Sequence, residues 1–222
     1  MTAIARARGL HKHFGATIAL AAVDFDAAPG ECIGLVGPNG GGRSTLLRLL
    51  ATLVRPSSGS IEIDGFDAVR QLYDARRRVA FVGEPAVAAH GLSARDYLTF
   101  VVNARSARTA TIRQTVVDQT LERAGLKPDA DVDTLSSGYR QRVTLAAAFL
   151  TDARVLLLDD PFRGFDAEAR LSFSVWLSEI RDGGTAIVAA FNDERDVRSV
   201  CHRAVRLENG RVGSMAPQAI AV

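Results

Sequence analysis

The fold of this chain is decided by one stretch near its amino terminus, residues 31–45, which reads ECIGLVGPNGGGRST. It starts with a short apolar run that is typical of a buried β-strand and continues through a cluster of glycines. The next segment, Ser44–Leu53, carries leucines at helical spacing. The stretch therefore predicts a strand, a glycine-rich loop and a helix in direct succession.

The glycine-rich part of this stretch, Gly37–Thr45, fits the phosphate-binding pattern GxxxxGK[ST] at every fixed position except the lysine, which is Arg43. Glycines allow successive backbone N–H groups to turn toward one anion, and the helix N-terminus adds partial positive charge. Ser44 would offer a hydroxyl to Mg²⁺. A glycine-rich turn without a ligand is the alternative, which the in-frame Ser-Thr pair and the flanking strand and helix disfavour.

Further short apolar runs occur at Val79–Val82, Val155–Leu158 and Thr185–Ala190, and polar or glycine residues bound them. Such runs are expected of strands that are buried on both faces, as in a parallel sheet. Ala167–Arg181 is long enough for a helix that connects two of these strands. The fold class is therefore α/β, with a P-loop (RecA-like) core and a mainly parallel sheet.

The middle of the chain differs, because Ser93–Ala124 and Tyr139–Leu150 have helical patterns with no convincing strand between them. We expect an inserted helical subdomain over residues 86–150 within a single domain, whose α/β core comprises residues 1–85 and 151–222. Edge-like antiparallel strands are expected near both ends, with a hairpin turn at Asn209-Gly210. These strands are Ile4–Leu10, Val23–Ala27, Ala204–Leu207 and Val212–Met215.

Composition excludes several classes of protein. The 222 residues are 47% hydrophobic and 23% charged, which excludes disordered, collagen-like and coiled-coil chains. A net charge of +2 gives no reason to expect a nucleic-acid partner. No apolar run is long enough for a membrane span or a secretion signal. Cys32 and Cys201 are too far apart in sequence to suggest a CxxC site, so we expect two buried, idle thiols in a reducing cytoplasm.

A second part of a nucleotide site is predicted at Val155–Asp160, where an apolar strand ends in paired carboxylates, a Walker B arrangement. Asp159 would hold Mg²⁺ through its water shell, because Mg²⁺ prefers oxygen ligands and keeps several waters. Asp160 would act on the attacking water as general base or orienting group. A helix cap or turn is the alternative for an isolated Asp-Asp pair, and the phosphate loop upstream makes the catalytic interpretation the stronger one.

Between these two motifs lies Leu135–Arg142, LSSGYRQR, and here the chain resembles the nucleotide-binding subunits of ABC transporters. Their signature is LSGGQ, and this chain departs from it at Ser137 and Tyr139. The resemblance implies that the segment reaches across a dimer to ATP on the partner, with Ser136, Ser137, Gly138 and Tyr139 as the signature residues. The start of a capped helix is the alternative interpretation of Ser136 and Gly138.

Other landmarks of the family follow in order, and the resemblance covers about residues 4–215. It implies that Phe14 stacks on adenine, that Glu84 takes the Q-loop position, that Asp166 belongs to the D-loop and that Asn192 takes the position of the switch histidine. A core position is the alternative for Phe14. The implied ATP-binding residues are Phe14, Gly37, Pro38, Asn39, Gly40, Gly41, Gly42, Arg43, Ser44 and Thr45; the catalytic ones are Asp160, Asn192 and Glu84; the Mg²⁺ ligands are Ser44, Asp159 and Glu84.

The resemblance implies ATP and Mg²⁺ as cofactors, and a subunit that couples ATP hydrolysis to transport. Residues 63–67, IDGFD, and 76–79, RRRV, look most like the ATPase subunits of exporters for drugs, sodium or other small cargo, so export is the expected direction. A second nucleotide-binding subunit and a transmembrane permease subunit, bound near Glu84–Ala104, are the implied partners. The implied location is the cytoplasmic face of the inner membrane. A P-loop kinase is a weaker alternative, because the signature and the order of the motifs speak against it.

Four positions near the γ-phosphate depart from the family pattern: Arg43 replaces lysine, Glu84 glutamine, Asp160 glutamate and Asn192 histidine. The guanidinium is wider than an ammonium, Asp is one methylene shorter than Glu, and Asn carries no charge. We therefore expect slow hydrolysis, as in the degenerate half of a heterodimer or a regulatory ATP-binding module. An ordinary active ATPase that tolerates these substitutions is the competing hypothesis.

Overall fold

The computed structural model describes residues 3–83, 91–105 and 110–213, apart from the side chain of Glu194. The chain forms two compact units. The first comprises residues 1–81, 153–160 and 178–222, and the second comprises residues 82–152 and 161–177. We had assigned residues 86–150 to the helical part; the second unit holds in addition the segment that follows the predicted Walker B strand.

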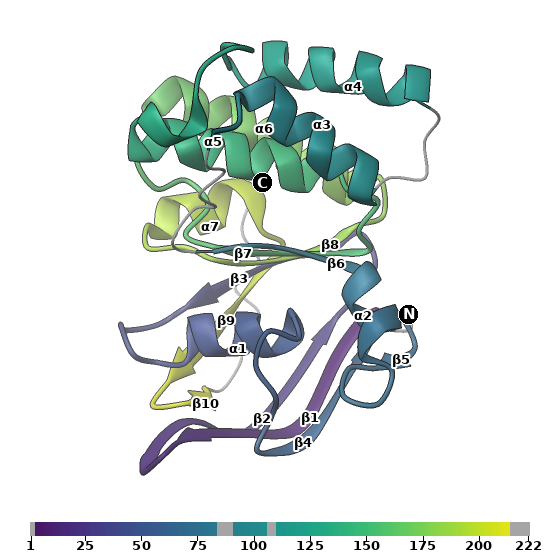
Figure 1. Ribbon diagram of the computed structural model, residues 1–222. Coiled ribbons are helices and arrows are strands. Elements are labelled where there is room, and N and C mark those ends of the chain that lie inside the picture. Colours follow the sequence, from purple (N-terminus) through teal and green to yellow (C-terminus); the bar gives the residue numbers. More distant parts are fainter. Residues whose placement is uncertain (1–2, 84–90, 106–109, 214–222) are drawn as a thin grey trace. The chain divides into compact units, whose positions relative to one another are not determined.

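A six-stranded sheet runs through the first unit (Figure 1). Its strands, in order across the sheet, are β10 (Arg211–Val212), β9 (Arg203–Glu208), β3 (Cys32–Val36), β8 (Ala186–Ala190), β7 (Val155–Asp159) and β6 (Val79–Val82). β9, β3, β8 and β7 pair in parallel, which confirms the α/β class. The expectation that Ala204–Leu207 forms an edge strand is wrong, because the strand at this position, β9, lies between β3 and β10. β10 is the strand at the end of the order.

The second sheet of the first unit is antiparallel, with the order β2-β1-β4-β5. Its strands are β1 (Ala5–Phe14), β2 (Thr17–Ala27), β4 (Ser58–Ile63) and β5 (Phe66–Asp67). The predicted amino-terminal strands exist but extend further, so that they meet in a tight hairpin around Gly15. β4 was not predicted, because only Ile61 and Ile63 on one face of it are buried hydrophobic residues.

Helix α1 (Arg43–Leu50) lies between the two sheets, and its buried leucines join the core that β1, β2, β3, β4, β7 and β8 share. The predicted helix continued to Leu53, but the chain turns at Thr52, whose φ of 58° is left-handed. The N–H of Thr52 donates to Leu49 O, and that of Leu53 to Arg48 O, which is the Schellman arrangement at a helix end. Leu53 therefore leaves the core and is 57% exposed.

Two short helices complete the first unit, α2 (Leu72–Arg77) and α7 (Glu194–Val200). α7 covers the face of the six-stranded sheet opposite α1 (Figure 1). Gly34 of β3 allows this close approach, since a Cβ there would meet the side chain of Val197 at 2.6 Å. Sequence patterns missed both helices because each is shorter than the window in which a helical period can be recognised.

The second unit is helical, as predicted. It contains α3 (Ala94–Arg105), α4 (Ala110–Arg123), a 3₁₀ turn (Val132–Thr134), α5 (Ser137–Phe149) and the first part of α6 (Ala167–Asp182). A cluster of aromatic rings forms part of its core, with ring centroids 4.8–6.0 Å apart. Its members are Phe149, Phe162, Phe165, Phe173 and Trp176.

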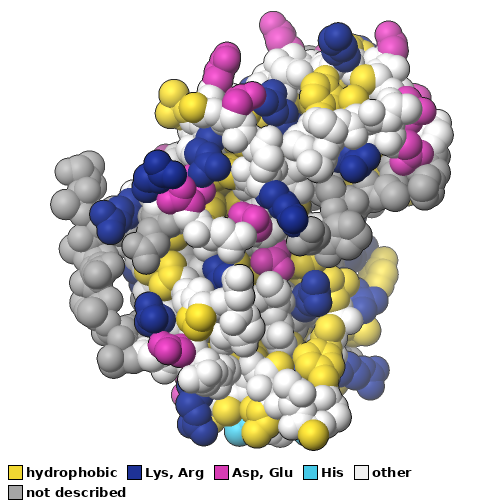
Figure 2. Space-filling view, turned by 90° about the vertical axis from the view of Figure 1, so that its left-hand side faces the viewer, with side chains coloured by type: hydrophobic (Ala, Val, Ile, Leu, Met, Phe, Trp, Pro, Cys, Tyr) yellow, Lys and Arg dark blue, Asp and Glu magenta, His cyan; other side chains and the backbone are white. Residues whose placement is uncertain are grey.

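Within the described residues, no helix has both the length and the apolar character that a bilayer crossing requires. Figure 2 shows basic side chains, Lys and Arg, interspersed with acidic ones on the face it presents.

Candidate functional site

The predicted phosphate loop connects β3 to α1 and is shaped by its glycines. Gly37 has a φ of 136°, and a Cβ on it would lie 1.9 Å from the carbonyl oxygen of Leu207 in β9. Gly42 has a φ of 106° and is the N-cap residue of α1 without a side-chain cap. A helix start that no side chain caps leaves its N–H groups available to an anion. The loop is therefore held close to β9 by its glycines and ends at a helix start that no side chain caps.

The hairpin between β9 and β10 supports this loop. Asn209 and Gly210 have φ values of 50° and 72°, as a type I′ turn requires, which confirms the predicted turn. The N–H of Gly210 donates to Gly41 O at 3.2 Å, and the Gly210 carbonyl accepts from the N–H of Ala21 at 2.8 Å. The turn thus joins the phosphate loop to β2.

The side chain of Arg43, in the lysine position, is held by three acceptors. One guanidinium nitrogen donates to the carbonyl oxygen of Phe191 at 2.8 Å. The other donates to the side-chain oxygens of Asn39 and Asn192, each at 3.3 Å. Asn39 belongs to the phosphate loop, whereas Phe191 and Asn192 follow β8. Arg43 therefore connects the two loops at the carboxyl ends of neighbouring parallel strands.

Asn192 continues the connection to the Walker B strand. Its amide nitrogen donates to the carboxylate of Asp160 at 2.8 Å. Asp160 follows β7 with a left-handed φ of 51°, and its N–H donates to Ala190 O at 2.8 Å. Strained backbone of this kind is typical of functional sites. We call the set Asn39, Arg43, Asn192 and Asp160 the Arg43–Asp160 network.

An amide is well suited to the middle of this network, because its oxygen accepts from the guanidinium while its nitrogen donates to the carboxylate. Three of the four departures from the family pattern therefore lie in one hydrogen-bonded chain. The fourth, Glu84, lies outside the described residues. Sequence reasoning placed Asn39 at the nucleotide but did not foresee its bond to Arg43, and it missed the Phe191 carbonyl altogether.

The residues predicted to hold Mg²⁺ offer hard oxygen donors. Ser44 stands in the first turn of α1, Asp159 ends β7, and both are partly buried. Within the described residues no three His, Cys, Asp or Glu side chains form a metal cluster. Mg²⁺ bound beside a nucleotide needs only one or two protein ligands, since phosphates and waters supply the rest. The donor set therefore fits that ion.

Phe14 ends β1 and is 52% exposed, so the alternative that it belongs to the core is wrong. The ammonium of Lys12 lies 4.6 Å from the centre of its ring and donates to the Arg55 carbonyl at 3.0 Å. One face of the ring is therefore paired with a cation, an arrangement that sequence reasoning missed. An exposed ring is free to stack on a planar ligand.

The predicted signature residues lie at the start of α5 in the second unit. The Ser136 hydroxyl accepts from the N–H of Tyr139 at 3.3 Å, so Ser136 is an N-cap, as the alternative interpretation held. Ser136 and Ser137 are nevertheless exposed. A Cβ on Gly138 would lie 2.3 Å from Gly164 O, so only glycine fits there.

Tyr139, in the glutamine position, binds into the scaffold of its own unit. Its hydroxyl donates to Gly125 O at 3.3 Å and accepts from the N–H of Lys127. Both contacts are with the turn that follows α4. Tyr139 thus holds the end of one helix against the start of another.

Asp166, predicted in the D-loop, begins α6. Its carboxylate accepts from the N–H of Ala169 at 2.8 Å and pairs with Arg142 at 2.8 Å. The hydrogen bond from Ala169, together with the charge of Arg142, lowers the pKa of Asp166. The guanidinium of Arg142 also lies 5.6 Å from the ring centre of Phe165. The signature segment, which contains Arg142, and the predicted D-loop, which contains Asp166, are therefore joined within the second unit.

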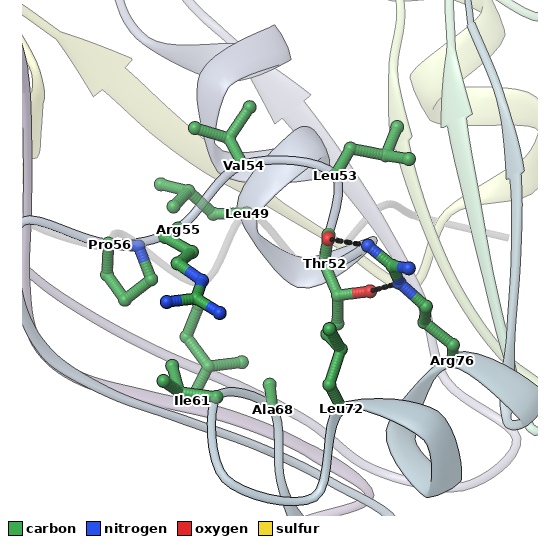
Figure 3. Close-up of a pocket in the computed structure, with 11 residues that line it drawn as sticks. Leu49, Thr52, Leu53, Val54, Arg55, Pro56, Ile61, Ala68, Leu72 and Arg76 are labelled. Carbon is green, nitrogen blue, oxygen red and sulfur yellow. Dashed lines mark hydrogen bonds between the residues drawn. The ribbon is translucent and has the colours of Figure 1, made fainter.

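A pocket of about 260 Å³ lies in the first unit where α1 ends, and sequence reasoning did not find it (Figure 3). Leu49, Ile61 and Leu72 are part of its apolar lining. Arg76 borders it and donates to the hydroxyl and the carbonyl of Thr52 at 2.9 and 3.0 Å. The phosphate loop lies at the opposite end of α1, and no predicted site residue lines the pocket.

Comparisons with known proteins agree with this geometry. Residues 20–163 match the family model of the ABC transporter. The chain is 36% identical over 204 residues to the sulfate/thiosulfate import ATP-binding protein CysA of Mycobacterium tuberculosis; the match covers 90% of the chain but 58% of that protein. It is 34% identical to the daunorubicin resistance ATP-binding protein DrrA3 of Streptomyces coeruleorubidus, over 92% of the chain and 65% of that protein.

A third relative, the Nod factor export ATP-binding protein I of Paraburkholderia xenovorans, is 34% identical over 94% of the chain and 69% of its own length. Among solved structures, the ATP-binding subunit of an ABC transporter superimposes with a TM-score of 0.90 at 25% identity, covering 97% of this chain and 90% of that one. A dimeric cassette bound to ADP and phosphate has the same fold, with a TM-score of 0.86 at 23% identity over 96% and 98% of the two chains. The chain therefore belongs to the ABC transporter family, of which it is an ATP-binding domain.

Proposed function

We propose that this chain binds MgATP at its phosphate loop and hydrolyses it to ADP and phosphate. The observation that carries the proposal is the Arg43–Asp160 network, which brings the phosphate loop, the Walker B strand and the loop after β8 within hydrogen-bond distance of one another. These are the three segments that must meet at a γ-phosphate.

In this proposal Asp160 accepts a hydrogen bond from the attacking water and takes its proton as the water oxygen bonds to the γ-phosphorus. The bond from that phosphorus to the bridging oxygen breaks, and ADP leaves. Asn192 positions the Asp160 carboxylate through its 2.8 Å hydrogen bond. Arg43 is the cation of the phosphate loop, and it must exchange at least part of its bonds to Phe191 and Asn192 for phosphate oxygens.

Mg²⁺, when bound, would neutralise part of the charge that develops on the phosphates. Ser44 and Asp159 are the described residues that would hold it, and Glu84 is the third ligand we propose. Phe14 would stack on the adenine, with its exposed ring as the supporting observation.

We further propose that two such domains pair, so that Ser136, Ser137, Gly138 and Tyr139 of each face the ATP of the other. A transmembrane permease subunit would complete the transporter at the cytoplasmic face of the inner membrane. Export is the direction that we propose, from the likeness of residues 63–67 and 76–79 to exporter subunits. The relatives carry both import and export names, so their names do not separate the two directions.

A second candidate is an ATP-binding subunit with slow turnover beside a complete partner. One observation favours it: Arg43 is bound to a backbone carbonyl and to two asparagine side chains, contacts that hold the guanidinium and that a lysine of different shape need not make. The names of the relatives give this candidate no support.

The test is Mg²⁺-dependent ATP binding and phosphate release by the purified chain. Asp160→Asn should lower the rate of phosphate release about a hundredfold or more while ATP still binds. Arg48→Lys, an exposed change on α1 away from the loop, is the matched control and should leave both unchanged. A wild-type chain that binds no ATP would overturn the proposal.

The same assay separates the two candidates. If the substitutions restrict turnover, Arg43→Lys and Asp160→Glu should each raise the rate of phosphate release. Robust wild-type turnover that neither change affects would rule out the slow-turnover candidate.

A further inference from the structure

We propose that Cys32 and Cys201 form a reversible disulfide when the chain meets a peroxide, which makes the pair a specific oxidation site. The two residues are 169 positions apart in sequence, yet their sulfur atoms lie 3.5 Å apart in the first unit. Both side chains are buried, and these are the two cysteines of the chain. The expectation that both thiols are buried is thus confirmed. The sequence did not indicate that the two thiols are in contact with each other.

The backbone holds the two cysteines in register. The N–H of Cys32 donates to the Nδ1 atom of His202 at 3.0 Å, and the N–H of His202 donates to the Cys32 carbonyl at 2.8 Å. Cys201 immediately precedes His202 and closes α7, where its N–H donates to Val197 O at 2.9 Å. Because two hydrogen bonds join Cys32 to His202, the residue next to Cys201, the two thiols lie close together whenever the first unit is folded.

Formation of the bond requires the two sulfur atoms to approach each other in a packed environment. A disulfide needs a sulfur–sulfur distance of about 2.0 Å, so the atoms must move about 1.5 Å closer. Gly34 lies beside the pair, and the place that a Cβ on it would take is already occupied, because Val197 and the Cys201 sulfur would be 2.6 and 3.2 Å from it. The proposal therefore requires rotations of the two cysteine side chains to supply this shift.

The chemistry requires one peroxide for two thiols. The sulfur of Cys201, whose residue is 5% exposed against 0% for Cys32, attacks one oxygen of hydrogen peroxide; the O–O bond breaks and a sulfenic acid forms with release of water. The sulfur of Cys32 then displaces the hydroxyl group, which leaves as a second water, and the S–S bond forms. Each sulfur gives one electron, and a dithiol such as dithiothreitol reverses the step.

The same geometry makes the attack of Cys201 on peroxide slow. The hydrogen bond shared with Cys32, together with burial, raises the pKa of Cys201, so this residue is a thiol at neutral pH. The bond, once formed, joins the start of the strand that leads to the phosphate loop to the end of the helix that follows Asn192.

The test treats the folded full chain with hydrogen peroxide and counts free thiols. Both thiols should disappear together in a monomer whose mass falls by two hydrogens, and proteolysis should yield a linked peptide that contains Cys32 and Cys201. Dithiothreitol should restore both thiols. The cross-link encloses a long loop, so the oxidised chain should unfold at a midpoint about 5 °C or more above that of the reduced chain.

Cys32→Ser and Cys201→Ser serve as controls, because each leaves one thiol that cannot form the internal bond. Three results would overturn the proposal. They are thiols that resist peroxide until urea unfolds the chain, loss of thiols through covalent dimers, and a mass increase from sulfinic or sulfonic acids without the linked peptide. Because the readout is the wild-type chain itself, the proposal stays testable if a variant fails to fold.

Discussion

The phosphate-loop region of the first unit and the signature region of the second unit both depart from the family pattern, but in different ways. In the first, the unusual residues bind one another: Arg43 contacts Asn192, which contacts Asp160. In the second, Tyr139 contacts the turn after α4, and Asp166 contacts Arg142 and the backbone of α6. The departures in the first region are therefore coupled, whereas in the second region Tyr139, a departure, and Asp166, which keeps the family residue, are each tied to the local scaffold.

This difference has a physical consequence for mutants. Residues in one hydrogen-bonded chain show interaction energies, so the effects of their substitutions do not add. Residues that contact separate parts of a scaffold are expected to act independently and to change stability more than chemistry. Each prediction below tests one side of this contrast.

The largest effect is expected from Gly37→Ala in the phosphate loop. A Cβ at this position would lie 1.9 Å from a backbone oxygen of β9, at a φ of 136° that alanine avoids, so the free energy of unfolding should fall by about 3 kcal/mol or more. Gly40→Ala is the control, because it has a positive φ but no atom within 4 Å, and it should cost about 1–2 kcal/mol. Urea unfolding measures both; equal losses would show that β9 does not shape the loop.

The coupling within the Arg43–Asp160 network gives the next effect, on turnover. Asn192→Ala removes the amide between Arg43 and Asp160, and the rate of phosphate release should fall about tenfold to a hundredfold. Combining it with Arg43→Lys should give a rate that differs from the product of the two single effects by about fivefold or more. Simple multiplication of the single effects would show that the contacts seen here do not operate in the reaction.

Much of the fold could be predicted from the sequence because its signals are local. Apolar runs identified β3, β6, β7 and β8, and glycines with Asn209 identified the loop and the hairpin turn. The strands and helices that sequence patterns did not predict are short and half exposed, so their apolar residues form no readable period: β4, β5, α2 and α7.

The site was predictable in its members and less so in its contacts. β3, β7 and β8 are parallel neighbours, and this placement brings Arg43, Asp160 and Asn192 to one sheet edge. Motif spacing anticipates that meeting. The hydrogen bond from Arg43 to the Phe191 carbonyl depends on the length and shape of the guanidinium in three dimensions. The hydrogen bonds of the Tyr139 hydroxyl depend on the position of a turn that lies 12 to 14 residues away in sequence. Neither can be read from a motif.

A smaller effect, on stability, is expected from Tyr139→Phe in the signature region. The change deletes a hydroxyl that binds Gly125 and Lys127, so the free energy of unfolding should fall by about 1–2 kcal/mol. Tyr73→Phe, at a side chain that is 70% exposed, is the matched control and should change it little. ATP binding to the phosphate loop of the monomeric chain should be unaffected by either substitution. A loss of ATP binding in Tyr139→Phe would contradict the separation of the two regions.

The smallest effect concerns Asp166, whose lowered pKa makes its contribution to stability depend on pH. A carboxyl with a lower pKa in the folded than in the unfolded state contributes fully above the unfolded value, about 3.9, and this contribution is lost as pH falls through the folded value. Asp166→Asn keeps a side-chain oxygen that can cap α6 but removes the charge that pairs with Arg142. The wild type should therefore be the more stable at pH 7, and the difference in unfolding midpoint should vanish on acidification below pH 4. A difference that persists at low pH would mean that the cap, and not the charge, separates the two side chains, and the second region would then depend on backbone capping alone.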